Sequence, residues 1–256
     1  MTDRYPDRLI TMLEAVWGEG FLSPGGPAEV GRIIGEHEIR GKSVLDIGCG
    51  AGGVGVALAE GLGAGYVTGI DVEDAVLARA RSLISARGLD TRVGLAKVAP
   101  GPLPFPDSSF DIVFSKDSIV HIADKHALMA EAFRVLKPGG WFLASDRLIG
   151  VEGAPSPLMA AYIAAEGLDF AMATPAEYRA AMVAAGFVSV AATSRNAWYR
   201  KEARDELGRL RGPLGSWAAD RVGQDFVNHT IAIWDRMIPV LDSGEHGPTH
   251  LAGQKP

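Results

Sequence analysis

The stretch VLDIGCGAGG at residues 44–53 decides the fold that we expect for this chain. It begins inside a short apolar segment, Ser43–Ile47, which predicts a strand, and it leads into a predicted helix over Val54–Glu60. The glycines at alternate positions between them permit a tight turn whose backbone approaches a ligand closely. Free N–H groups at the start of the helix would favour an anionic or polar group there. The alternative is a turn that only joins strand and helix.

Strands and helices alternate on the carboxyl side of this stretch. The alternation predicts βαβ units, a parallel sheet and helices on both of its faces. The predicted strands are Tyr66–Ile70, Thr91–Leu95, Phe110–Ser115, Trp141–Ser145 and Phe187–Thr193, with Pro248–Gln254 as a candidate last strand. The predicted helices are Ala28–His37, Glu73–Arg87, Lys125–Leu136, Pro175–Ala185, Trp198–Arg211 and Asp220–Leu241.

Composition narrows the class of protein and its partners. The 256 residues carry a net charge of −6, so we expect no nucleic-acid partner, because phosphate neutralisation needs clustered cations. The single cysteine, Cys49, excludes a disulfide framework and a multi-cysteine metal site, and we expect no metal. No apolar run reaches the roughly 18 residues of a membrane span, and Met1–Arg8 has no apolar signal core. We therefore expect a cytoplasmic protein without membrane contact.

Two acids sharpen the interpretation of the glycine turn. Asp46 ends the first strand, where a buried carboxylate needs a partner, and Asp71 ends the second strand, where a carboxylate can hold two ribose hydroxyls. With the Gly-x-Gly-x-Gly spacing, this pattern resembles the S-adenosylmethionine loop of class I methyltransferases rather than a dinucleotide site. The segments Phe110–Val113 and Leu136–Gly140 resemble the fourth strand of that fold and the turn before its fifth strand.

The resemblance implies an α/β fold: the Rossmann-like, seven-stranded sheet of class I methyltransferases, with an antiparallel last strand and helical lid insertions. It also implies S-adenosyl-L-methionine as cofactor and S-adenosyl-L-homocysteine as product. An acid after the third strand, which usually meets the adenine, is missing here, so backbone groups at Lys97 and Val98 are expected to hold it. The other cofactor-binding residues implied in the core are Asp46, Gly48, Gly50, Asp71 and Val72.

A closer resemblance extends over nearly the whole chain, to the phosphoethanolamine N-methyltransferases of plants, nematodes and protozoa. Those enzymes methylate a phosphorylated ethanolamine three times towards phosphocholine. The matching segments are WGEGFLSPGG at 17–26, FSKDSIVHI at 114–122, PSP at 155–157 with Tyr162 and Ile163, and the tail around Trp234 and 243–245.

The resemblance implies a catalytic pair, Tyr5 on the N-terminal lid and His121 after the fourth strand, with Asp117 beside the substrate amine. An alkylammonium has a pKa of roughly 10 and cannot attack a methyl group until a base removes its proton. The alternatives are that His121 is a helix cap or core histidine and that Tyr5 only packs. Contacts to the cofactor from outside the glycine turn are implied for Ser23, Ser115 and Lys116.

The chain departs from the family in the phosphate cage, where the family uses two tyrosines, an arginine and a lysine. The matching positions here are Arg147, Leu168, Glu166 and Met237; Tyr162 persists, and Leu13 stands where the lid helix has another tyrosine. Because Glu166 would repel a phosphate dianion, we expect a non-phosphorylated, zwitterionic or amino-acid-like amine whose carboxylate is bound by Arg147. The substrate-binding residues are then Arg147, Tyr162 and Glu166.

Several alternatives stay open. Arg147 and Glu166 can pair with each other, and the enzyme can be a phosphoethanolamine or other phosphobase N-methyltransferase. Methyl transfer to oxygen or sulfur, or cofactor binding without catalysis, are further possibilities. In every case the partner is a small molecule, and the chain is expected to be a monomer or homodimer. We expect one domain over 1–256, with a lid (1–40), a cofactor-binding core (41–146) and substrate-capping helical insertions (147–173 and 195–245).

Overall fold

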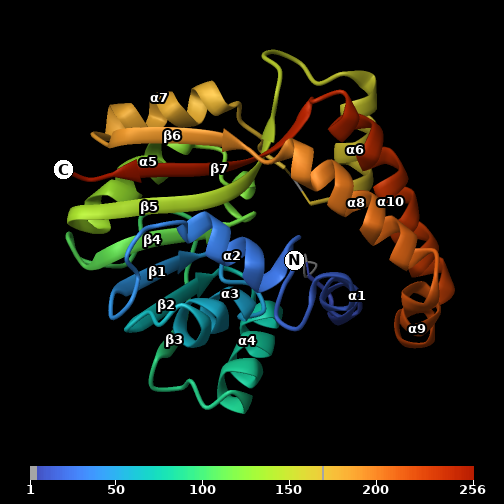
Figure 1. The fold of residues 1–256 in the computed structure, drawn as a ribbon, viewed down its shortest axis with the longest axis horizontal. Helices are drawn as coiled ribbons and strands as arrows, with labels where there is room; N and C mark the ends of the chain where they lie inside the picture. The colour runs from blue at the N-terminus through green and yellow to red at the C-terminus, as the bar shows by residue number, and fades with distance from the viewer. Residues whose placement is uncertain (1–4, 169) are drawn as a thin grey trace.

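A seven-stranded sheet lies at the centre of the computed structural model, which describes residues 5–168 and 170–256 (Figure 1). The strand order is β3-β2-β1-β4-β5-β7-β6, and β7 runs antiparallel to both of its neighbours, as expected for the last strand. The strands are β1 (Ser43–Ile47), β2 (Tyr66–Asp71), β3 (Val93–Lys97), β4 (Phe110–Lys116), β5 (Leu136–Ile149), β6 (Val188–Ser194) and β7 (His246–Gln254).

Helices cover the sheet and extend beyond one of its ends. The α-helices are α1 (Asp7–Trp17), α2 (Gly26–Ile34), α3 (Gly53–Val56), α4 (Asp74–Ala86), α5 (Lys125–Val135), α6 (Pro157–Glu166), α7 (Pro175–Ala185), α8 (Asn196–Leu210), α9 (Pro213–Val222) and α10 (Gln224–Asp242). A π-helical turn, η1 (Ala57–Gly61), and a 3₁₀ turn, η2 (Ile119–His121), complete them. Within the described part of the chain, no helix is long and apolar enough to cross a membrane.

The two faces of the sheet belong to two apolar cores. Successive residues of β1 point to opposite faces, so Val44 joins one core and Leu45 the other. Val44 lies in the core shared with α1, α2 and the helices α8 to α10, and Leu45 lies in the core shared with α5 and α7. Figure 1 shows α1, α6, α8, α9 and α10 gathered at the end of the sheet to which β1 and β4 deliver their carboxyl ends.

Three predicted elements differ from the structure, and only the first difference depends on a distant part of the chain. β5 continues through Arg147 to Ile149, where we expected a helical excursion, because its last residues pair with β7 up to Ile149 and His246. The long helix expected over Asp220–Leu241 is broken at Gly223, whose φ of 91° ends α9 and starts α10 at a new angle. The predicted helix at Val54–Glu60 is α3 followed by the π-helical turn η1.

Candidate functional site

The glycine turn between β1 and α3 is fixed against the end of β2. The backbone N–H groups of Gly48 and Cys49 both donate to the carbonyl of Ile70, at 2.9 and 3.0 Å. Gly48 has a φ of +74°, and a side-chain carbon there would lie 1.7 Å from Oγ of Ser118. Position 48 therefore requires glycine for its conformation and for the close approach of the segment after β4.

Asp46 is buried at the end of β1 with neither carboxylate oxygen hydrogen-bonded to any described residue. Burial raises its pKa to about 8; the nearby Asp71 adds to this shift and Lys116 opposes it. A buried carboxylate without a partner is costly, and such groups occur where a ligand completes the pairing. Asp46 thus fits a position that holds a polar ligand group.

Asp71 ties the glycine turn to the end of β2. One of its oxygens accepts from the N–H of Gly50 at 3.0 Å, and the other accepts from Val72 and Glu73 at 2.8 and 3.1 Å. Burial raises its pKa although these three donors favour the charged form. A carboxylate offers about four lone-pair sites, so acceptor capacity is left for ribose hydroxyls.

The two residues expected near the adenine lie at the end of β3 and just beyond. The N–H of Val98 donates to the backbone carbonyl of Asp71 at 3.0 Å, which places this segment beside the ribose-binding position. The side chain of Lys97 instead forms a surface ion pair with Asp74 at the start of α4. Recognition by Lys97 through its backbone stays a prediction.

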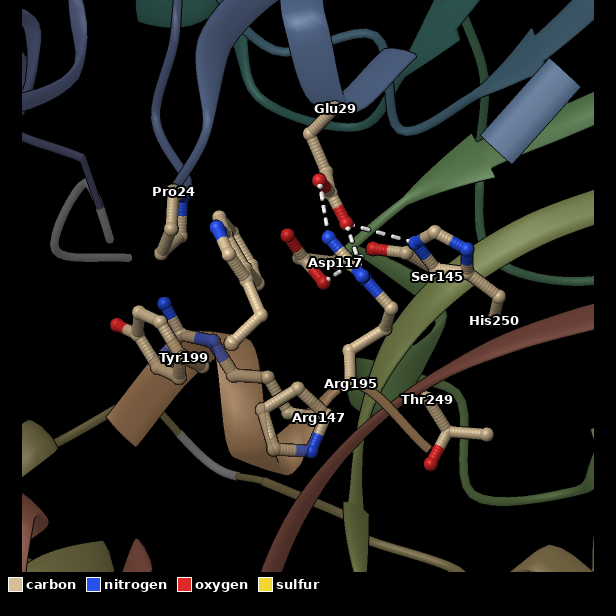
Figure 2. Close-up of a pocket in the computed structure, with 11 residues that line it drawn as sticks. Pro24, Glu29, Asp117, Ser145, Arg147, Arg195, Tyr199, Thr249 and His250 are labelled. Carbon is tan, nitrogen blue, oxygen red and sulfur yellow. Dashed lines mark hydrogen bonds and ion pairs between the residues drawn. The ribbon is translucent and has the colours of Figure 1, made fainter. Parts of the chain in front are cut away.

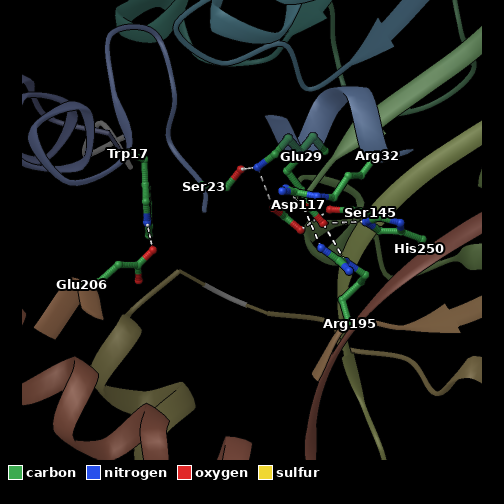
Figure 3. Close-up of polar contacts among 10 residues, drawn as sticks. Trp17, Ser23, Glu29, Arg32, Asp117, Ser145, Arg195, Glu206 and His250 are labelled. Atoms are coloured by element: carbon green, nitrogen blue, oxygen red, sulfur yellow. Dashed lines mark hydrogen bonds and ion pairs between the residues drawn. The ribbon is translucent and has the colours of Figure 1, made fainter. Parts of the chain in front are cut away.

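A buried lysine joins the N-terminal segment to β4. Lys116 donates from Nζ to Oγ of Ser23 at 2.5 Å and to Asp117 at 3.1 Å (Figure 3). Next to it, Ser115 donates from Oγ to the carbonyl of Ile47 at 2.8 Å, which connects the ends of β4 and β1. The three residues predicted outside the glycine turn are therefore brought to its edge.

Asp117 presents a charged carboxylate at the carboxyl end of β4. Its φ is +53°, and its oxygens accept from Ser145 at 2.7 Å and from Lys116 at 3.1 Å. Burial disfavours the charged form, but the charges of Lys116 and Arg147 outweigh it and lower the pKa of Asp117. Beside Asp117, Ser145 and Arg147 lies a cavity of about 20 Å³ (Figure 2), room for about one water molecule.

Arg147, Tyr162 and Glu166 meet in one buried cluster. The guanidinium of Arg147 lies 3.3 Å from Oε1 of Glu166, and the hydroxyl of Tyr162 donates to the same oxygen at 2.8 Å. This ion pair is the arrangement that the simpler alternative predicted. The guanidinium carbon also lies 5.4 Å from the centre of the Phe170 ring.

The two residues of the expected catalytic pair face the same region from different elements. Tyr5 precedes α1; burial raises the pKa of its phenol to about 12, and Arg147 and Asp71 are the nearest charges that act on it. His121 ends η2, and its ring centre lies 5.5 Å from that of Phe170, the ring that also contacts Arg147. The catalytic roles of both residues stay predictions.

A second ionic cluster closes the outer side of the cavity beside Asp117. Glu29 of α2 accepts from Nε and Nη2 of Arg195, both at 2.9 Å, from Arg32 at 3.0 Å, and lies 2.7 Å from Nε2 of His250 (Figures 2 and 3). Burial acts against ionisation, but the hydrogen bonds from His250 and Arg195 lower the pKa of Glu29 to about 2. The cluster joins α2 to the start of α8 and to β7.

Some residues of the site were missed by the sequence analysis. Ser145 orients Asp117 from the neighbouring strand, and Asp146 fixes the segment of His121 by accepting from the N–H of Val120 at 3.0 Å. Ser145 ends the predicted strand Trp141–Ser145 and Asp146 follows it, at the edge where functional side chains of such folds gather, so their position was a usable signal. His246 lies against Tyr162 from β7, and nothing local in the sequence indicates it.

The described residues contain no group of three or more His, Cys, Asp or Glu side chains that could hold a metal ion. An orphaned carboxylate at Asp46 and a glycine cradle at Gly48 instead fit an organic ligand with polar groups. The arrangement can hold such a ligand over the turn and place an acidic and a basic side chain, Asp117 and Arg147, beside it.

Residues 44–140 match the family described as "Methyltransferase domain". The chain is 32% identical over 237 residues to a phosphoethanolamine N-methyltransferase of Triticum aestivum, covering 92% of this chain and 46% of that protein. It is 28% identical over 256 residues to phosphoethanolamine N-methyltransferase 2 of Caenorhabditis elegans, covering 99% of this chain and 57% of that protein. The chain thus spans about half the length of the curated relatives it matches.

Among solved structures, phosphoethanolamine N-methyltransferase 2 of Haemonchus contortus, in complex with phosphomonomethylethanolamine and S-adenosylhomocysteine, superposes with a TM-score of 0.88. It is 25% identical in sequence, and the match covers 98% of this chain and 59% of that one. The expected class of fold is therefore confirmed: the chain has the class I methyltransferase fold and resembles the phosphoethanolamine N-methyltransferases.

Proposed function

We propose that this chain, which has the class I methyltransferase fold, is an S-adenosylmethionine-dependent methyltransferase. Its substrate would be the amine of a small phosphobase such as phosphoethanolamine. The substrates named for its relatives support this alternative better than the non-phosphorylated substrate expected from the altered phosphate cage. The observation that carries the proposal is that a carboxylate with a lowered pKa, Asp117, and a buried cation, Arg147, line the same cavity. A molecule with an ammonium at one end and an anion at the other matches both charges.

The glycine turn and its acids support the cofactor assignment. Asp71 has acceptor capacity for ribose hydroxyls, Asp46 offers two oxygens without a partner among the described residues, and Gly48 permits the close approach of Ser118 to the turn. Lys116 and Ser23 would contact the amino-acid end. When bound, S-adenosylmethionine supplies a methyl group on a sulfonium, which is open to attack by a neutral amine.

The residues of this chain divide the work on the amine. Asp117 is ionised and holds the substrate ammonium by a charge-assisted hydrogen bond. Because the pKa of Tyr5 is raised to about 12, its phenol is protonated at neutral pH. It can accept the proton of the substrate only while it donates its own proton to another group. We propose His121 as the acceptor of that proton.

One observation favours a second candidate, a small zwitterion such as an amino acid. Glu166 already sets a carboxylate against Arg147, at 3.3 Å. The carboxylate of an amino acid would replace it charge for charge, whereas a phosphate dianion adds a negative charge to the pocket. The two candidates share the amine chemistry and differ only in the anionic end.

The test is transfer of labelled methyl from S-adenosylmethionine to a panel of phosphoethanolamine, its N-methylated forms, ethanolamine, glycine and sarcosine. We expect kcat/KM to be highest for the phosphobases and to fall by about 10² or more in Asp117→Asn. Asp90→Asn, which removes an exposed carboxylate, serves as the control. Cofactor binding without transfer to any amine would refute the proposal; a preference for glycine or sarcosine would select the second candidate.

A further inference from the structure

A buried aromatic and charged cluster lies on the side of Arg147 away from the glycine turn. His246, the first residue of β7, stacks on the ring of Tyr162, with ring centres 5.4 Å apart and planes 28° apart. Tyr199 of α8 meets the same imidazole edge-on at 6.4 Å. His246 is fully buried; its ring interacts with the nearby backbone of Leu148, but neither ring nitrogen has a partner in hydrogen-bond geometry among the described residues.

The imidazole of His246 is held in a neutral, unused state. Burial and then the positive charge of Arg147 lower its pKa to about 3, while its interaction with the backbone of Leu148 and the charge of Asp117 act in the other direction. A neutral imidazole has one N–H donor and one acceptor. Buried groups left without partners are rare in native proteins, and their usual explanation is a ligand or a catalytic role.

A carboxylate of the chain itself occupies the position in front of Arg147. One oxygen of Glu166 forms an ion pair with the guanidinium of Arg147 and accepts a hydrogen bond from the hydroxyl of Tyr162. Glu166 is the last residue of α6, and Gly167 follows it in the left-handed conformation with a φ of 66°. Displacement of Glu166 needs its side chain to leave these two partners.

We propose that Arg147 and His246 form the subsite for the anionic end of the substrate, and that Glu166 occupies this subsite as an internal counter-ion until the substrate displaces it. The inference rests on the proposed function and adds to it what sets the charge preference of the enzyme. A singly charged group replaces Glu166 on equal terms. A dianion has to displace the carboxylate of Glu166 because it adds a negative charge to a buried pocket. In its place it accepts a hydrogen bond from the N–H of His246.

Calorimetry with the protein saturated with S-adenosylhomocysteine tests the inference without catalysis. The probes are inorganic phosphate, O-phosphoethanolamine and ethanolamine, the last as an amine without an anion. In Glu166→Gln we expect phosphate and phosphoethanolamine to bind about tenfold to a hundredfold more tightly, because the competing charge is gone. His246→Leu should weaken both about tenfold. Ethanolamine should change less than twofold in either variant, and Glu152→Gln, an exposed acid after β5, should change nothing.

The outcomes separate the inference from the proposed function. Unchanged or weaker phosphate binding in Glu166→Gln, or no binding of either anionic probe to the wild type and this variant, overturns the inference. So does unchanged binding in a folded His246→Leu, which would leave His246 as a packing residue. If phosphate binding shifts as expected but the wild type methylates no amine, the proposed function fails and the anion subsite stands. Glu166→Ala replaces Glu166→Gln if the latter does not fold.

Discussion

The buried carboxylate of Glu206 makes the stability of this protein fall between pH 5 and pH 8. Glu206 lies on α8 and is fully buried; one oxygen accepts from the indole N–H of Trp17 at 2.6 Å, and the other accepts from that of Trp234 at 2.9 Å. It thereby joins the N-terminal helix α1 to α10 (Figure 3 shows the bond to Trp17). Burial raises its pKa to about 7, although both indoles favour the charged form.

The sign follows from the direction of this pKa shift. The folded protein holds the proton of Glu206 more tightly than the unfolded chain, so protonation stabilises the fold. That stabilisation is fully present below pH 4.5, the ordinary pKa, and it is lost as the pH rises through 7. Linkage between these two values gives a fall of about 2–3 kcal/mol in the free energy of unfolding from pH 5 to pH 8.

Urea denaturation of the wild type and Glu206→Gln at pH 5, 6, 7 and 8 measures this contribution. The carbonyl oxygen of the glutamine amide accepts from one indole N–H, but its NH₂ group, a donor, faces the N–H of the other indole. That second hydrogen bond is lost, so the variant is less stable at pH 5 by about 1–3 kcal/mol. The gap should narrow towards pH 8 by about 2–3 kcal/mol, because only the wild type loses stability at this position. Asp205→Asn, an exposed acid on the same helix, should follow the wild type.

The difference between the two proteins isolates Glu206, since the other buried acids titrate alike in both. Asp46 and Asp146, whose pKa values burial raises to about 8 and about 7, add the same pH dependence to each curve. Stability profiles that run parallel from pH 5 to pH 8 would show that Glu206 is ionised throughout, and the reasoning would be refuted.

Three further predictions concern the cofactor turn and the cluster behind it. Gly48→Ala should abolish cofactor binding in a thermal-shift titration, whereas Gly139→Ala, which has a similar φ of +78° and open space around it, should bind normally; equal behaviour would exclude the steric cause. Asp46→Asn should lower cofactor affinity at least about tenfold while the protein becomes no less stable to urea, because the buried acid that it replaces has no hydrogen-bond partner among the described residues; lost stability would mean that the carboxyl group is paired. Glu29→Gln should lower the free energy of unfolding by about 3 kcal/mol at pH 7, a gap that closes as the pH falls from 4.5 towards 2, while the exposed Glu19→Gln should cost less than about 1 kcal/mol. A gap for Glu29→Gln that persists at pH 2 would contradict the ionic origin.

The parts of the fold that short segments determine were predictable from the sequence. The glycine turn, Asp46 and Asp71 occupy neighbouring positions because each lies at the carboxyl end of a strand of a parallel sheet, and periodicity alone located those strands. The extension of β5 to Ile149 was not predictable, because its partner β7 comes about a hundred residues later in the sequence. A single glycine, Gly223, broke a helical pattern that continues on both sides of it.

The site was predictable where the chain resembles its relatives and unpredictable where it differs from them. Ser23, Ser115 and Lys116 come together as expected, since contacts between segments of recognisable motifs connect them. The residues at the positions of the phosphate cage showed which charges are present but not where they lie. From the sequence we expected Arg147 to be free for a substrate carboxylate, whereas in the structure it forms an ion pair with Glu166. Side chains from distant elements decide such a pairing, and one sequence does not order them in space.

The position of the N-terminal segment supports the lid that we predicted for it. The N–H of Gly53, at the start of α3, donates to the carbonyl of Gly20 at 3.0 Å, so this segment lies directly over the glycine turn. Ser23 continues it to the edge of the cavity beside Asp117, whose roughly 20 Å³ are too small for any phosphobase. For the proposed substrates we expect entry and release to require this segment to open, and the bond from Trp17 to Glu206 holds its helix where the structure has it. If opening exposes Glu206 to water, ionisation of this carboxylate above pH 7 would favour opening as well as lower stability.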